Sequence, residues 1–335
     1  MALCDWSNLQ KTRRNIVNSY THPRPSSDTF RHLNDVIAAE VDRLIETLRE
    51  ESTGGGRIQP KQPLLQACAN VFTSYLCSRR FEAEDEDFRE MVKCFDLIFY
   101  DINQGYAVDF LPWLAPCYKR HFGDLEGWSK TIRAFILQYI VGEHEAEAVP
   151  GEPRDFVDVL LDHLRNEGDI DWQSALFELE DLIGGHSAIG NLWMRIVAQM
   201  VQNPDVMAAL QEEIEAVTGG KRPVTLDDRP DMPYTEAVML EALRIISSPI
   251  VPHVATADTT IQGFAVEEGT VIFLNNYELN TSPLYWNDPW KFNPGRFVQN
   301  GQIVKPDFFI PFSTGKRACM GYRLVQSLTF MLVAR

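Results

Sequence analysis

Hydrophobic and polar positions alternate along most of this chain with the spacing of α-helices. From Phe30 to Glu50, apolar residues recur at every third or fourth position, which is the buried stripe of an amphipathic helix. Asp28 is placed to cap this helix, and the glycines at 54–56 are placed to end it. The same periodicity predicts further helices at about 5–18, 63–79, 86–104, 122–143, 172–202, 204–217 and 233–246.

Strand character appears only late in the sequence. β-branched and aromatic residues predict strands at 251–257, 259–264 and 270–275, with turns at Gly263 and at Glu268-Gly269. A segment rich in Pro, Gly and Glu at 146–154 predicts a linker that breaks the helical series. The pattern therefore predicts a mainly α fold with a small β region.

The longest predicted helix, 172–202, carries an internal glycine pair. Gly184 and Gly185 are expected to interrupt it, because each glycine in a helix interior costs roughly 1 kcal/mol. The pair predicts either a kink or the close approach of another group to the backbone.

Composition and charge narrow the class of protein. The chain has 335 residues, of which 45% are hydrophobic, so it can bury a sizeable core. Its formal net charge of -16 argues against a nucleic-acid binder, which needs a cationic surface. No run of eighteen apolar residues and no basic-apolar leader follows Met1, so neither a membrane span nor a signal peptide is predicted.

Six cysteines are present, and one of them differs from the rest. They show no CxxC pair and no disulfide-framework spacing, which is typical of a reducing compartment. Cys4, Cys68, Cys77, Cys94 and Cys117 stand in apolar contexts, as small core residues do. The sixth follows an arginine in a glycine-bounded loop and is a candidate for chemistry.

The loop containing this cysteine has the pattern F-x-x-G-x-R-x-C-x-G. A chance match in a chain of this composition is on the order of one in ten thousand. Gly315 and Gly321 permit tight turns that bring backbone N–H groups towards a sulfur. Arg317 offers a fork for a carboxylate, Cys319 is a soft anionic ligand, and Phe312 shields it from water.

This loop resembles that of the cytochrome P-450 family, in which the cysteine ligates haem iron. Two further motifs support the resemblance. Glu241 and Arg244 form E-x-x-R within a predicted helix, and Arg296 lies in the segment 292–297, at the family's interval before the cysteine. The resemblance implies a buried structural triad of these three residues on the proximal side of the haem.

The oxygen-side helix departs from the family pattern. Its usual signature is A/G-G-x-D/E-T, and the aligned residues are Gly184, Gly185, His186, Ser187 and Ala188. In the family the acid and the threonine organise proton delivery to iron-bound oxygen. Ser187, His186 or ordered water are the candidates to replace them.

The resemblance also implies partners for the haem propionates. Trp6 matches the tryptophan of an early W-x-x-x-R pattern, but its fourth neighbour is Gln10, followed by Lys11. Either residue is a candidate for the arginine's role. His253 stands at the corresponding strand position, and Arg317 at the loop position.

Set against the family, 1–335 corresponds to a single partial cytochrome P-450 domain. It runs from the early tryptophan helix to the helix after Cys319, so the resemblance implies a fold truncated at both ends, without the N-terminal membrane anchor and the C-terminal hairpin. The run Phe177–Asn191 resembles the insect ecdysteroid-forming spook group, and Pro249–Asn276 the steroid-hydroxylating microsomal branch.

The implied function is a monooxygenase with haem b, acting on a sterol in ecdysteroid biosynthesis. Electrons would come from NADPH through a flavoprotein reductase, docked on a cationic patch of Lys11, Arg13, Lys316 and Arg323. The implied location of the full-length parent is the endoplasmic reticulum membrane, reached only through the missing anchor. Two alternatives stay open: a haem-thiolate isomerase or dehydratase that does not use oxygen, and a truncated, non-catalytic helical protein.

Overall fold

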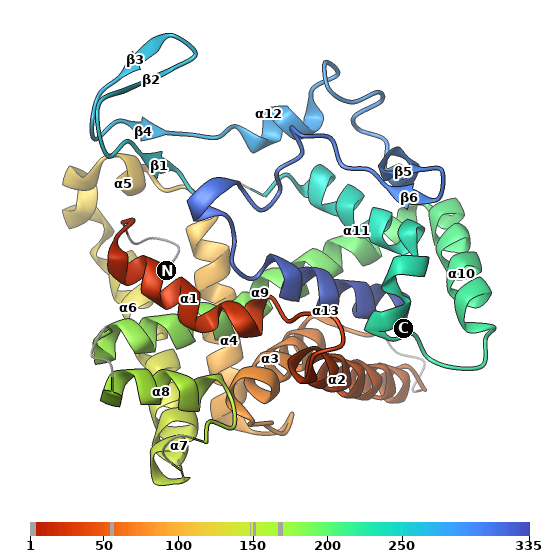
Figure 1. Ribbon diagram of the computed structural model, residues 1–335, viewed down its shortest axis with the longest axis horizontal. Helices are drawn as coiled ribbons and strands as arrows, with labels where there is room; N and C mark the ends of the chain where they lie inside the picture. Colours follow the sequence, from red (N-terminus) through yellow and green to blue (C-terminus); the bar gives the residue numbers. More distant parts are fainter. Residues whose placement is uncertain (1–4, 54–56, 148, 150–151, 167–169, 249) are drawn as a thin grey trace.

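A single long helix, α9 (Trp172–Gln202), packs against helices that precede it and helices that follow it in the chain (Figure 1). The computed structural model describes residues 5–53, 57–147, 149, 152–166, 170–248 and 250–335. Cys4, the glycines at 54–56 and part of the predicted linker at 146–154 lie outside these residues. The expectation of a mainly helical chain is confirmed.

The helices before α9 form one group. They are α1 (Asn8–Thr21), α2 (Asp28–Thr53), α3 (Lys61–Cys77), α4 (Glu86–Ile102), α5 (Ala107–Phe110), α6 (Lys119–Ile136), α7 (Gly142–Glu147) and α8 (Phe156–Asn166). A 3-10 helix, η1 (Pro112–Tyr118), and a π-helical turn, η2 (Leu137–Val141), connect them. α8 was not predicted, although four of its apolar residues are buried.

The elements after α9 form the second group. The helices are α10 (Pro204–Thr218), η3 (Leu226–Asp231), α11 (Pro233–Ile246), α12 (Asn276–Thr281), η4 (Pro294–Phe297), η5 (Gly315–Arg317) and α13 (Tyr322–Ala334). The strands are β1 (His253–Val254), β2 (Thr259–Ile261), β3 (Phe264–Val266), β4 (Val271–Ile272), β5 (Val298–Gln299) and β6 (Gln302–Ile303). They form three antiparallel pairs, β1 with β4, β2 with β3 and β5 with β6.

Two local expectations were wrong. The expected turn at Gly263 is confirmed, since Gln262 and Gly263 both have positive φ, but the predicted strand 259–264 ends at Ile261 and Phe264 begins β3. Asp28 does not cap α2, since it is the first helical residue. The hydroxyl of Ser27 instead accepts a hydrogen bond from the N–H of Phe30 at 3.1 Å.

The core has two parts, and α9 contributes to both. Leu182, Ile183 and Ile189 pack with the earlier helices, while Ile196 and Met200 pack with α10, α11 and the segment beyond them. α13 lies beside α9, where the indole N–H of Trp193 donates to the Leu332 carbonyl at 2.9 Å. The end of α9 therefore ties the late elements to the early helical group.

A fully buried carboxylate joins α11 to the segment before the cysteine loop. Arg244 donates to both oxygens of Glu241, at 2.7 and 2.8 Å, and Arg296 donates to the same carboxylate at 3.0 Å. The N–H of Asn293 adds a fourth hydrogen bond at 2.9 Å. Glu241 and Arg244 are both 0% exposed, so this is a fully paired ionic group in the interior.

The two arginines extend this network into the backbone around it. Arg244 donates to the Asn280 carbonyl at 2.6 Å, and Arg296 to the Asn287 carbonyl at 2.9 Å. Both guanidinium groups also lie against the ring of Trp286, at 5.1 and 5.7 Å. The triad thus positions an irregular chain segment that has little secondary structure of its own.

A second buried charged group fastens α7 to α8. The two ring nitrogens of His144 contact the Ile140 carbonyl at 2.6 Å and a carboxylate oxygen of Asp155 at 2.8 Å. Both partners are acceptors, so the protonated imidazolium satisfies both contacts. Asp158 also lies within 4.8 Å, but Arg154 binds it at 2.7 Å, which makes the cluster a structural clamp.

Neutralising the buried carboxylate should destabilise the fold strongly. In Glu241→Gln, two guanidinium groups lose their shared anion, and breaking such a pair typically costs about 3–5 kcal/mol. We expect the free energy of unfolding, measured by urea titration, to fall by that amount. Glu90→Gln is the control, because its pair with Lys93 is exposed and worth about 1 kcal/mol or less. Equal losses in the two variants would contradict this role.

The His144 clamp should make stability depend on pH. Burial lowers the pKa of His144, but the hydrogen bond and charge of Asp155 outweigh burial and hold the pKa above its ordinary value. Its contribution is fully present below the unfolded pKa and is lost as pH rises through the folded one.

We therefore expect His144→Gln to lower the free energy of unfolding more at about pH 6 than at about pH 9. Chemical denaturation at both values measures this double difference. His32→Gln, which changes an exposed histidine, is the control variant. A His144 effect that is independent of pH would rule out the charged pair.

Candidate functional site

Cys319 lies in a tight loop between η5 and the first turn of α13. The N–H of Cys319 donates to the Phe312 carbonyl at 2.9 Å, and the N–H of Ala318 donates to the Gly315 carbonyl at 3.2 Å. Gly315 has a φ of +70°, a conformation that favours glycine. These constraints hold the cysteine at the N-terminal end of α13.

The surroundings of the Cys319 sulfur favour its anionic form in part. Burial raises the pKa of this thiol, while a hydrogen bond from the Gly321 N–H and the charge of Arg14 lower it. The start of α13 adds partial positive charge. Cys319 is nevertheless an exposed residue, so a ligand could approach the loop from solvent.

Gly321 contributes through its N–H and not through special backbone geometry. Its φ is -83°, which other residues also adopt, and an added Cβ would meet no atom within 4 Å. Of the two glycines expected to permit tight turns, only Gly315 needs to be glycine for its backbone conformation.

The prediction for Arg13 was wrong, and the contact of its neighbour Arg14 with the cysteine loop was not predicted. We expected Arg13 in an exposed cationic patch, but it is 2% exposed and pairs with Glu178 of α9 at 3.4 Å. Burial raises the pKa of Glu178 to about 7. Arg14 instead reaches the cysteine loop and donates to the Ala318 carbonyl. Helical periodicity alone could not tell which of two adjacent arginines faces the loop.

Three of the residues expected near the haem propionates, Trp6, Gln10 and Lys11, lie at or just before the start of α1. α1 begins at Asn8 and is capped by Ser7, so Trp6 precedes the helix in which we expected it. The ammonium of Lys316 lies 5.8 Å from the Trp6 ring centroid. Gln10 is buried and Lys11 is exposed, so Gln10 is the inward-facing member of this pair.

The remaining predicted residues of the loop and strand are half-buried. Arg317 ends η5, and the ring of Phe312 lies 6.1 Å from that of Tyr322. His253 is in β1, and its Nδ1 is buried with no hydrogen-bond partner among the residues that the structure describes. A buried polar atom in that state suits a ligand that brings its own polar group.

The expected interruption of α9 at Gly184 and Gly185 was wrong, since the helix is continuous there. The alternative, close approach of another group, fits the observed packing. A Cβ on Gly184 would lie 2.7 Å from the ring of Phe95 in α4. Glycine at 184 therefore allows an aromatic ring to rest directly on the helix backbone.

The candidate relay residues His186 and Ser187 lie on the side of α9 opposite to Gly184, Gly185 and Ala188. At roughly 100° per residue, Gly184, Gly185 and Ala188 share one side of the helix, and His186 and Ser187 share the opposite one. The first three are half-buried, whereas both relay candidates are 0% exposed.

The imidazole of His186 is held in this packing. Its Nδ1 contacts the Ile183 carbonyl at 2.6 Å, and its ring meets Phe95 edge-on at 5.3 Å. Burial lowers the pKa of His186 to about 4, so it is neutral at physiological pH. This side chain is accounted for by helix packing.

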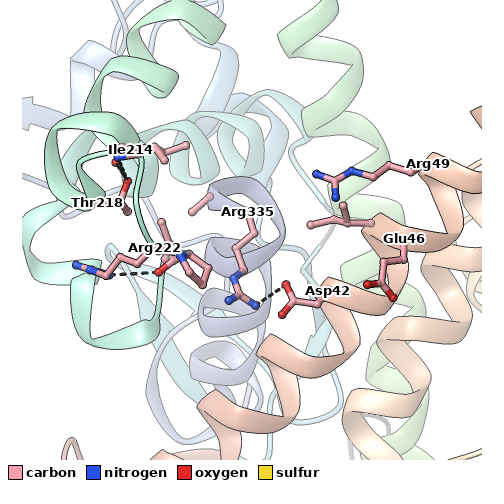
Figure 2. Close-up of a pocket in the computed structure, with 12 residues that line it drawn as sticks. Asp42, Glu46, Arg49, Ile214, Thr218, Arg222 and Arg335 are labelled. Atoms are coloured by element: carbon pink, nitrogen blue, oxygen red, sulfur yellow. Dashed lines mark hydrogen bonds and ion pairs between the residues drawn. The ribbon is translucent and has the colours of Figure 1, made fainter.

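A separate pocket of about 470 Å³ lies between α2, the end of α10 and the end of α13 (Figure 2). Arg335 pairs there with Asp42 at 2.8 Å, and Arg222 donates to the Pro223 carbonyl at 3.2 Å. α13 extends roughly 20 Å from Tyr322 to this point. The pocket is therefore not part of the Cys319 site.

Comparison with known proteins gives a consistent answer. The family model described as Cytochrome P450 matches residues 2–335. Cytochrome P450 307a1 of Drosophila melanogaster is 42% identical over 99% of this chain and 66% of its own length. Cytochrome P450 2J5 of Mus musculus is 34% identical over 89% of this chain, and Farnesoate epoxidase of Bombyx mori 32% over 90%. The chain spans 61–66% of the length of these relatives.

A solved structure extends the similarity to the fold. A zebra fish cytochrome P450, described with progesterone, aligns with a TM-score of 0.83 and 28% identity, covering 100% of this chain and 76% of that one. None of the described helices is long and apolar enough to cross a membrane. The resemblance drawn from the cysteine loop is confirmed, and the chain belongs to the cytochrome P450 family.

Proposed function

We propose that this chain binds haem b through Cys319 and forms the catalytic part of a monooxygenase that acts on a sterol-like substrate. The observation that carries the proposal is the cysteine loop itself. It presents an exposed cysteine at a helix N-terminus. Burial raises the pKa of its thiol, and the Gly321 N–H and the Arg14 charge oppose that rise. These two groups favour the thiolate, which is the form that ligates iron.

The described residues fit the remainder of a haem. The buried, unpartnered Nδ1 of His253 and the exposed Lys316 beside Trp6 offer donors for carboxylates. On the helix that would cover the oxygen side, Ala188 is half-buried and small, while the rings of Phe95 and Phe72 lie against Gly184 and Gly185. When bound, the haem would supply reductive activation of oxygen.

In this proposal, the residues of α9 that would lie on the oxygen side of the haem do not transfer protons themselves. Ala188 has no hydroxyl group, and His186 and Ser187 face the helix packing. We infer that ordered water on the half-buried face delivers protons. The ring of Phe95, resting on Gly184, limits the height of the space above that face.

The sterol assignment rests on similarity. The segment Phe177–Asn191 resembles the ecdysteroid-forming spook group, and the similar zebra fish protein is described with progesterone. A role in ecdysteroid biosynthesis follows as the finer proposal. On the same microsomal resemblance, we propose the endoplasmic reticulum membrane as the location of the full-length enzyme.

The electron donor in this proposal is a flavoprotein reductase that takes electrons from NADPH. Lys11, Lys316 and Arg323 are exposed around the cysteine loop and the adjacent helix ends, against a chain of formal charge -16. We define these three residues as the proximal cationic patch. Arg13 is not part of it, because it is buried against Glu178.

The carbonyl difference spectrum of the reduced protein tests the ligand assignment. We expect a thiolate-type band that is lost in Cys319→Ala, because alanine cannot ligate iron. Cys117→Ala is the matched control, since Cys117 is also exposed and should leave the band unchanged. Absence of the band from the unmodified chain would instead support a non-catalytic helical protein.

Dependence on oxygen separates the monooxygenase from a haem-thiolate isomerase or dehydratase. We expect turnover of a sterol substrate to require both oxygen and NADPH with reductase, because the proposed reaction inserts an oxygen atom. Product analysis under air and under argon measures this. Equal turnover under argon would overturn the monooxygenase.

Charge reversal tests the proximal cationic patch. In the double variant Lys11→Glu, Arg323→Glu, we expect at least several-fold slower haem reduction by the reductase, because complementary charge steers association. The haem content should not change. Lys130→Glu is the control, since Lys130 is exposed on α6. Unchanged reduction in the double variant would remove the patch from the proposal.

A further inference from the structure

We propose that Arg14 is a positioning residue for the proximal ligand, fixing the peptide before Cys319 and raising the reduction potential of iron bound there. The proposal rests on the haem function proposed above and names a residue that the cysteine loop alone does not reveal. Arg14 is on α1, 304 residues away in sequence from the carbonyl that it binds.

The hydrogen bonds of one peptide unit carry the positional argument. The carbonyl of Ala318 accepts from the Arg14 guanidinium, and the N–H of Cys319 donates to the Phe312 carbonyl at 2.9 Å. The peptide group between Ala318 and Cys319 therefore has both its carbonyl oxygen and its N–H in hydrogen bonds, one to Arg14 and one to Phe312. The Cα of Cys319 can turn little about this unit unless one of the bonds breaks.

The charge distribution carries the electrostatic argument. Arg14 is half-buried, so its charge is screened less than that of an exposed side chain. Burial lowers the pKa of Arg14, and the neighbouring charge of Arg317 lowers it further, while Cys319 raises it. Arginine remains protonated under such shifts. The charges of Arg14 and Arg317 therefore lie close enough to repel each other beside the loop. An anionic Cys319 sulfur would offset this repulsion.

A fixed positive charge near a thiolate-ligated iron favours the reduced state, because reduction adds one negative charge. Loss of the charge should make reduction harder at a given potential. Loss of the hydrogen bond should free the Ala318 carbonyl and loosen the loop. Both effects act on the iron through the protein, so Arg14 touches neither substrate nor oxygen in this proposal.

The test is spectroelectrochemical titration of the haem-loaded protein, with haem content measured alongside. In Arg14→Gln we expect a potential shifted to a more negative value, equivalent to a roughly ten-fold lower ratio of reduced to oxidised protein at a fixed potential. In Arg14→Lys, which keeps the charge but loses the planar fork, we expect a smaller shift in the same direction. Arg14→Lys decides the matter if Arg14→Gln does not retain haem.

Arg24→Gln is the control, because it removes the same charge from an exposed residue just beyond α1 and should not change the potential. Unchanged potentials in the Arg14 variants, with or without loss of haem, would reduce Arg14 to a packing role and overturn the proposal. If the unmodified protein shows no thiolate-type band, the haem function itself fails, and this inference fails with it. The wild-type spectrum thus distinguishes the two failures.

Discussion

The buried carboxylate of Glu241 is the interaction on which the late part of the structure depends. Between α11 and the cysteine loop, much of the chain is short strands, single helical turns and irregular backbone, which cannot satisfy its own polar groups. Arg244 and Arg296 satisfy several of these carbonyls, and Glu241 holds both arginines in place. An ionised group costs several kcal/mol to bury, so it persists only because every partner is present.

The two sides of helix α9 differ in burial and in the residues that they carry. His186 and Ser187 lie on the packed side, where burial keeps the imidazole neutral and its hydrogen bonds are local. Gly184, Gly185 and Ala188 lie on the half-buried side, where small residues let the rings of Phe95 and Phe72 approach the backbone. The departure from the family's acid-threonine pattern therefore leaves a buried serine at 187 and no hydroxyl group at 188, while Phe95 rests on Gly184, which keeps the family pattern.

The first helix gives its two adjacent arginines different roles. Arg13 is turned inward and compensates Glu178 of α9, while Arg14 faces the cysteine loop. Successive helical residues differ by roughly 100° in direction, so neighbours in sequence reach different elements. α1 thereby connects α9 with the loop that carries Cys319.

The sequence by itself determined the helical fold class, most helix positions and the grouping of Glu241, Arg244 and Arg296 in one ionic triad. These features are encoded locally, by apolar periodicity and by short motifs whose spacing is fixed by the covalent chain. Tertiary structure decided what lies next to each residue: Phe95 against Gly184, Arg14 rather than Arg13 at the loop, and the inward direction of His186. Periodicity shows that a helix has a buried side, but which partner covers that side depends on contacts between segments far apart in sequence, and on whether burial leaves a charge paired.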